Sequence, residues 1–163
     1  MKFKTVITSS LTMLLAASMA WGEPVIKDGD SIAFLGDSLT YLGYQHKPNG
    51  YVNLVLEGLK FAGVNVTPYP AGIGGNTTRD MLARLDRDVI SKKPAWMTLN
   101  SGINDSPRMD LEEFSANLAK IVDRATEAGI KVILITTSVG SGEKLEAPET
   151  AKRAAFAEAF RKL

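Results

Sequence analysis

The chain has 163 residues, 45% of them hydrophobic, which is enough apolar material for one domain with a core and too little for two. Its formal net charge of +1 gives no signal for binding nucleic acid or an anionic membrane. The sequence contains no cysteine, which excludes disulfides, thiolate chemistry and cysteine metal sites.

The first 22 residues have the three parts of a secretory signal peptide. Two lysines precede an apolar stretch, residues 6–21, and small residues that suit cleavage follow. A retained membrane anchor is the alternative, but the apolar stretch is short for a membrane span. We expect residues 1–22 to be a signal peptide, the protein to be secreted or periplasmic without a stable membrane anchor, and residues 23–163 to form one domain.

Apolar runs and amphipathic stripes alternate along the rest of the chain. Short apolar runs predict strands at residues 31–35, 64–69, 95–100 and 131–137. Helical spacing predicts helices over 51–61, from Thr77 or Thr78 to the residues before Pro94, over 110–128, and over a final stripe at 156–163. Because parallel neighbours require crossover connections, this alternation predicts a parallel sheet covered by helices on both faces.

Several residues recur at the spacing of a buried helix face. These residues, which we expect to pack in the core together with Trp96, are Val52, Val55, Leu56, Leu59, Met81, Leu85, Val89, Leu111, Phe114, Leu118, Ile121, Val122, Ala125, Phe156, Phe160 and Leu163.

Three short motifs each follow a predicted strand. They are Gly36-Asp37-Ser38-Leu39, Gly72-Ile73-Gly74-Gly75-Asn76-Thr77 and Gly102-Ile103-Asn104-Asp105. Ligands of open parallel sheets bind beyond the carboxyl ends of the strands. The motifs are therefore placed where a binding or catalytic site is expected.

Each motif also has an ordinary interpretation when taken alone. The first is common turn chemistry, and it is not the Gly-x-Ser-x-Gly elbow because Thr40 stands where that elbow has glycine. The second is either a tight turn or a close backbone approach to a ligand, and Thr77 replaces the last glycine of a dinucleotide loop. The third contains Asn104-Asp105, which equally suits an Asx-turn.

Together, and in this order, the three motifs resemble those of the SGNH or GDSL hydrolase family. That family draws a serine, a glycine, an asparagine and a histidine from four separated blocks, and the resemblance here runs from residue 32 to about 137. It implies an α/β fold, a three-layer α/β/α sandwich with a flavodoxin-like, mostly parallel sheet of strand order 2-1-3-4 and a fifth strand missing.

The resemblance also implies roles for individual residues. Ser38 would be the nucleophile, and the Ser38 amide, the Gly75 amide and the Asn104 side chain would form the oxyanion hole. Gly74 is the alternative to Gly75, because the second motif has Gly74 and Asn76 where relatives often carry serine and aspartate.

The fourth block of the family, an Asp-x-x-His near the C-terminus, is absent from this sequence. The only histidine, His46, follows Ser38 by eight positions in a polar loop, with no nearby group to orient it as a base. We expect His46 to lie at the surface, the domain to be C-terminally incomplete, and the catalytic histidine and aspartate to lie outside these residues. Asp37 and Asp105 are expected to brace their loops rather than to bind a metal.

The family resemblance implies a serine esterase that hydrolyses a small acyl ester through an acyl-enzyme, without cofactor or metal. An ester of an O-acetylated carbohydrate suits an exported protein, with lipid and thioester substrates as competitors. One alternative is a non-catalytic ligand-binding protein that retains the pocket. A second, a nucleotide-binding flavodoxin-like module, is disfavoured by the spacing of the glycines.

The signal peptide leads to a first prediction. When the natural gene is expressed in its own cell, we expect export and cleavage near residues 20–22, because charged, apolar and small residues occur in the order that signal peptidases recognise. Intact-mass spectrometry of the recovered protein checks this. A soluble cytoplasmic form that retains Met1 would contradict it.

Overall fold

The structure is a computed structural model that describes residues 25–45, 48–136 and 147–163. The predicted signal peptide and His46 lie outside these residues. Four strands form one sheet, β1 (Ser31–Gly36), β2 (Thr67–Gly72), β3 (Trp96–Asn100) and β4 (Lys131–Ile135). They are all parallel, in the order β2-β1-β3-β4. The predicted fold class and the predicted order of these strands are confirmed.

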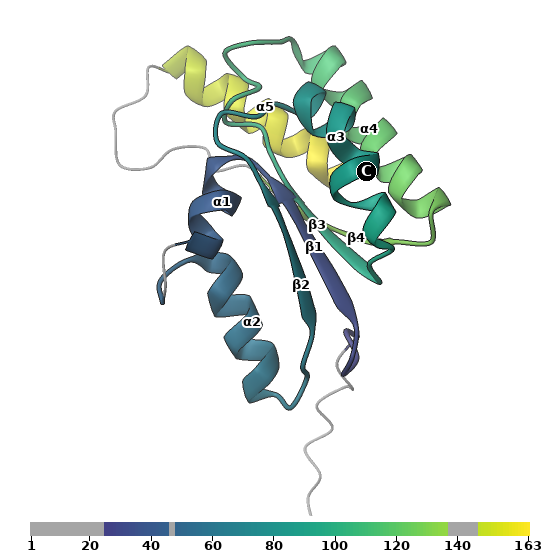
Figure 1. Ribbon diagram of the computed structural model, residues 1–163. Helices are drawn as coiled ribbons and strands as arrows, with labels where there is room; N and C mark the ends of the chain where they lie inside the picture. Colours follow the sequence, from purple (N-terminus) through teal and green to yellow (C-terminus); the bar gives the residue numbers. More distant parts are fainter. Residues whose placement is uncertain (1–24, 46–47, 137–146) are drawn as a thin grey trace, which may run out of the picture.

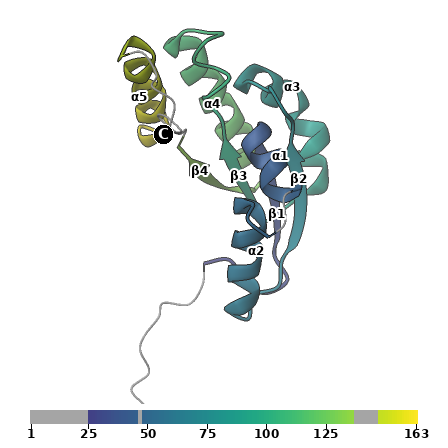
Figure 2. The same ribbon diagram turned by 90° about the vertical axis from the view of Figure 1, so that its left-hand side faces the viewer.

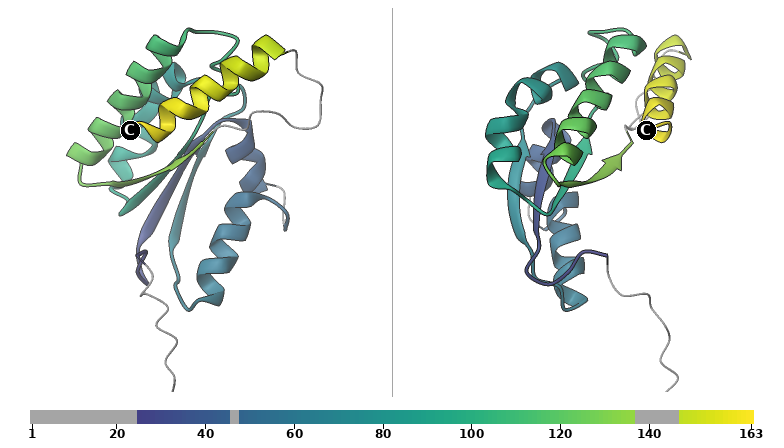
Figure 3. Two further views of the ribbon diagram at one scale, coloured as in Figure 1. Left: turned by 180° about the vertical axis from the view of Figure 1, so that it is seen from behind. Right: turned by 90° about the vertical axis from the view of Figure 1, so that its right-hand side faces the viewer.

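Helices cover both faces of this sheet (Figure 1). One face carries α1 (Ser38–Gln45) and α2 (Tyr51–Phe61), which lie nearest the viewer in Figure 2. The other face, which Figure 3 shows from two further sides, carries α3 (Thr78–Asp88), α4 (Leu111–Glu127) and α5 (Ala147–Arg161). A short 3-10 turn, η1 (Ile90–Lys92), follows α3.

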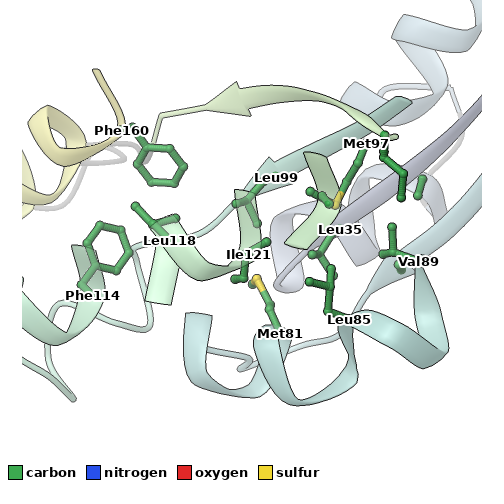
Figure 4. Packing of buried hydrophobic residues seen from close by; sticks show 14 of the residues in the cluster. Leu35, Met81, Leu85, Val89, Met97, Leu99, Phe114, Leu118, Ile121 and Phe160 are labelled. Atoms are coloured by element: carbon green, nitrogen blue, oxygen red, sulfur yellow. The ribbon is translucent and has the colours of Figure 1, made fainter. Parts of the chain in front are cut away.

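The side chains of β1 alternate between two hydrophobic clusters, as a central parallel strand requires. Ala33 and Leu35 belong to the larger cluster, beneath α3, α4 and α5. Ile32 and Phe34 belong to the smaller cluster, beneath α1 and α2. Figure 4 shows the larger cluster, with the predicted stripe of α3 packed close to residues of the sheet.

Most predicted core residues are buried. The predicted stripe of α3 and its C-terminal cap, Met81, Leu85 and Val89, is fully buried. So are Phe114, Leu118, Ile121, Ala125 and Phe156. The rings of Phe114 and Phe156 stack with their centroids 4.4 Å apart, which joins α4 to α5. Three residues were wrongly predicted to be in the core: Val55, Leu111 and Leu163 have 41%, 40% and 54% of their surface exposed.

Two elements differ from the sequence prediction. β2 occupies 67–72 rather than 64–69, so that it ends level with β1 at the second motif. Its two prolines are two residues apart and therefore direct their missing N–H groups to the same side, which suits a strand at the sheet edge. The helix α1 was not among the predicted helices, because its eight residues are few, carry no charge and include Gly43.

Within the described ranges, no helix has both the length and the apolar character needed to cross a membrane.

Candidate active site

The three motifs lie side by side at the carboxyl ends of β1, β2 and β3. Gly36, the last residue of β1, pairs in register with Gly72 on one side and with Asn100 on the other. The carbonyl of Gly36 also accepts a hydrogen bond from the Ile73 amide, N···O 3.0 Å. The strand ends are therefore level. The first two motifs begin at the last residue of their strands, and the third begins two residues after β3 ends.

Ser38 is the first residue of α1 and is half-buried. The helix begins here because Asp37 caps it, with its Oδ1 accepting from the amide of Leu39 at 2.9 Å. The first amides of a helix have no partner within the helix, so the Ser38 N–H is available to bind negative charge. A free amide at the start of a helix is a donor of the kind that can bind an anion.

Asp37 is almost fully buried directly before the predicted nucleophile. Burial raises the pKa of this carboxyl, the negative charge of Asp105 raises it further, and the hydrogen bond from Leu39 opposes both effects. The carboxyl braces its turn as predicted.

Two glycines allow α1 to approach the strand ends closely. A Cβ on Gly36 would lie 2.0 Å from the Thr40 hydroxyl oxygen, and one on Gly72 would lie 2.3 Å from the backbone nitrogen of Tyr41. The second clash is with backbone, which cannot rotate away. These contacts explain why the first two motifs each have glycine at the strand end.

The second motif turns at Gly75, whose φ of +78° lies in the left-handed region that favours glycine. The Gly75 carbonyl accepts from Nη1 of Arg108 at 2.6 Å. Thr77 then begins α3 through a capping box with Asp80, whose carboxylate accepts from both the amide and the hydroxyl of Thr77. Thr77, and not Thr78, is the helix cap.

Asp105 joins the second motif to the third. It is fully buried, and its Oδ1 accepts from the amide and the hydroxyl of Thr78 at 2.7 and 2.6 Å. Its Oδ2 accepts from the amide of Gly102 at 2.9 Å, which closes the turn of its own motif. The bracing role predicted for Asp105 is confirmed, and it extends to the start of α3.

Asn104 lies against the second motif. Its Nδ2 donates to the backbone carbonyl of Asn76 at 3.1 Å. An amide nitrogen carries two hydrogens, so one remains for a further acceptor. The structure thus brings Asn104 next to the Gly75-Asn76 segment, and the sheet register brings Ser38 to the neighbouring strand end.

Sequence reasoning missed Arg84, which is buried on α3 and hydrogen-bonds to both the first and the second motif. The sequence did contain a pattern that indicates burial of Arg84, because this residue follows Met81 by three residues and precedes Asp88 by four. An arginine on a buried helix face with an acid one turn away is the pattern of a buried ion pair.

A hollow beside α1, lined in part by Leu39 of the first motif, has a volume of about 350 Å³. The residues of its lining that the structure describes are uncharged: Leu39, Leu42, Gly43, Asn49, Gly50 and Tyr51. Among the residues that the structure describes, no group of three or more histidine or acidic side chains is arranged to hold a metal ion.

Comparison with known proteins agrees with this arrangement. Residues 34–163 match the GDSL-like Lipase/Acylhydrolase family model, and the chain belongs to that family. An acetylxylan esterase of Geobacillus stearothermophilus is 32% identical, with 69% of this chain and 61% of the relative covered. Esterase TesA of Pseudomonas aeruginosa is 29% identical, with 79% and 61% covered.

Solved structures show the same fold. The acetylxylan esterase Axe2 from Geobacillus stearothermophilus is 28% identical and aligns with a TM-score of 0.71, over 84% of this chain and 72% of that chain. The acetyl xylan esterase AlAXEase is also 28% identical, with a TM-score of 0.69 over 81% and 71%. This chain spans about three fifths of the length of the two named curated relatives, 61% of each.

The bonds of Asp105 lead to a second prediction. Replacing Asp105 with alanine leaves buried donors of Thr78 and Gly102 without their acceptor, so we expect the free energy of unfolding to fall by about 3–5 kcal/mol. The matched control is Asp110→Ala, which removes one exposed cap bond to the Glu113 amide and is expected to cost about 1 kcal/mol. Urea denaturation measures both, and equal losses would contradict the prediction.

Proposed function

We propose that this protein is a serine carboxylic-ester hydrolase with Ser38 as its nucleophile. The observation that supports this best is the convergence of the three family motifs at one end of the sheet, with Asn104 bonded to the backbone of Asn76. The acetylxylan esterase relatives support the reaction class.

In the proposed reaction the Ser38 hydroxyl oxygen attacks the ester carbonyl while a general base takes its proton. The carbonyl oxygen becomes an oxyanion, which accepts hydrogen bonds from the Ser38 and Gly75 amides and the Asn104 side chain. Collapse breaks the bond to the alcohol, which leaves with the proton, and forms the acyl-enzyme. Water then attacks, the base takes its proton, and release of the acid restores Ser38. The reaction requires no cofactor or metal.

We propose that a histidine, oriented by an aspartate, supplies the base from a polypeptide longer than these 163 residues. The support comes from Axe2, whose solved structures include catalytic mutants of a serine and of a histidine. The sequence here has one histidine, His46, and it lies outside the described residues.

For the substrate we propose a small acyl ester, with an O-acetylated carbohydrate as the first candidate. The names of the acetylxylan esterase relatives support this choice. Export, proposed from the signal-like residues 1–22, would bring the enzyme to such substrates.

A third prediction concerns the nucleophile and the oxyanion hole in the natural full-length polypeptide. We expect Ser38→Ala to abolish hydrolysis of p-nitrophenyl acetate, and Asn104→Ala to lower kcat about a hundredfold to a thousandfold by removing one oxyanion donor. Matched controls are Ser91→Ala and Asn65→Ala, two exposed positions away from the motifs, which should retain the parent rate. Substantial turnover by Ser38→Ala would refute the assignment.

A fourth prediction concerns the base. The chain of residues 23–163 alone is expected to show no esterase turnover, because it supplies no oriented histidine. A polypeptide that also carries an Asp-x-x-His block is expected to be active and to lose activity when that histidine becomes alanine. If residues 23–163 hydrolyse esters and His46→Ala removes this activity, His46 is the base and the proposal is wrong.

A further inference from the structure

Arg84 is a charged side chain in the interior, with 7% of its surface exposed. Burying a guanidinium is costly unless its charge is paired and its N–H groups are bonded. Here both conditions hold. Nη1 donates to Oδ2 of Asp88 at 2.9 Å, Nε to Oδ1 of Asn76 at 2.7 Å, and Nη2 to the Gly36 carbonyl at 3.1 Å.

Only the first of these bonds is needed to balance the charge. Asp88 lies one turn further along α3 and lowers the cost of burial by itself. Its pKa is lowered first by a hydrogen bond from Arg87 and then by Arg84, so it is ionised at neutral pH. The other two bonds join α3 to the second motif at Asn76 and to the first motif at Gly36.

Those two bonds fix atoms on which the proposed chemistry depends. The Gly36 carbonyl lies two residues before Ser38, at the point where β1 ends. Asn76 accepts from Arg84 through its side chain and from the Nδ2 of Asn104 through its backbone carbonyl. A single guanidinium therefore links the first motif to the second, and through Asn76 it reaches Asn104 in the third.

We propose that Arg84 is a positioning residue that sets the oxyanion donor Asn104 against Ser38, acting through Asn76 and Gly36. The inference rests on the proposed esterase function. Oxyanion donors stabilise the transition state only when they lie at hydrogen-bond distance from the developing charge. A small displacement of Asn76 would therefore lower kcat more than it would weaken substrate binding.

Lysine cannot replace Arg84 in this role. Its ammonium is a point charge, whereas the planar guanidinium presents several donors in fixed directions. Arg84→Lys keeps the charge beside Asp88 but cannot also reach Asn76 and Gly36 with the same geometry. This variant separates the charge of the residue from its positioning role.

The test is a double-mutant cycle in the natural full-length polypeptide, with p-nitrophenyl acetate as substrate. Arg84→Lys is expected to lower kcat about tenfold to a hundredfold with little change in KM. Asn104→Ala, expected to cost about a hundredfold or more in the parent, should cost less in the Arg84→Lys background, by about the factor that Arg84→Lys itself costs. The control Arg87→Lys changes an exposed arginine that also bonds to Asp88, and it should leave kcat unchanged.

A second pair of variants keeps the proposal testable if Arg84→Lys does not fold. Asn76→Ala removes the acceptor of the Nε bond, and Asn76→Asp retains an oxygen there. We expect Asn76→Ala to lower kcat about tenfold and Asn76→Asp to restore most of that loss. Equal rates in the two Asn76 variants, or additive losses in the cycle, would overturn the proposal.

One measurement distinguishes failure of this inference from failure of the proposed function. The side-chain NH₂ resonances of Asn104, assigned by their loss in Asn104→Ala, report its bond to Asn76 without any turnover. They should shift in Arg84→Lys and stay in place in Arg87→Lys. Unmoved resonances overturn the positioning role, whereas shifted resonances in a protein that hydrolyses no ester would refute only the proposed function.

Discussion

The parallel register of the sheet is the constraint on which the rest of this site depends. Gly36 pairs with Gly72 and with Asn100, so the three motifs leave the sheet at one level. A shift of register in any of these strands would separate the motifs by several ångströms. The hydrophobic clusters on both faces hold that register, because each residue of β1 from Ile32 to Leu35 is buried against helices.

Buried polar groups then connect the loops that the sheet brings together. Asp105 bonds to the start of α3, Asn104 to the second motif, and Arg84 to both the first and the second. Such groups cost free energy to bury and are retained when they are fully bonded. The buried carboxyl of Asp37 accounts for part of this free-energy cost. Its raised pKa means that the native state binds its proton more tightly, so its contribution lowers stability as the pH rises through and above its unfolded value of 3.8.

The sequence was most informative where a pattern repeats over many residues. The stripe of α3 and the alternation of strands and helices predicted a parallel sheet with helices on both faces, because burial imposes a period on apolar residues. The strand order was implied by the family resemblance. Leu163 and Leu111 fit the same period but lie on exposed surface, since a period alone does not say which positions a neighbouring element covers.

The site was predictable in part. The motifs could be placed at the strand ends, and the bracing roles of Asp37 and Asp105 followed from their positions in tight turns. The hydrogen bond from Arg84 to the Gly36 carbonyl could not be predicted. It joins residues 48 apart, and a backbone carbonyl has no sequence signature. The helix α1 was missed because eight uncharged residues give too little pattern.

The central claim, that Ser38 is an activated nucleophile, is tested most directly by covalent trapping. A fluorophosphonate reacts with a serine only when a base and an oxyanion hole activate it. In the natural full-length polypeptide we expect a single adduct, which tandem mass spectrometry places on Ser38. No adduct, or an adduct on another residue such as Ser101 or Ser106, would contradict the account.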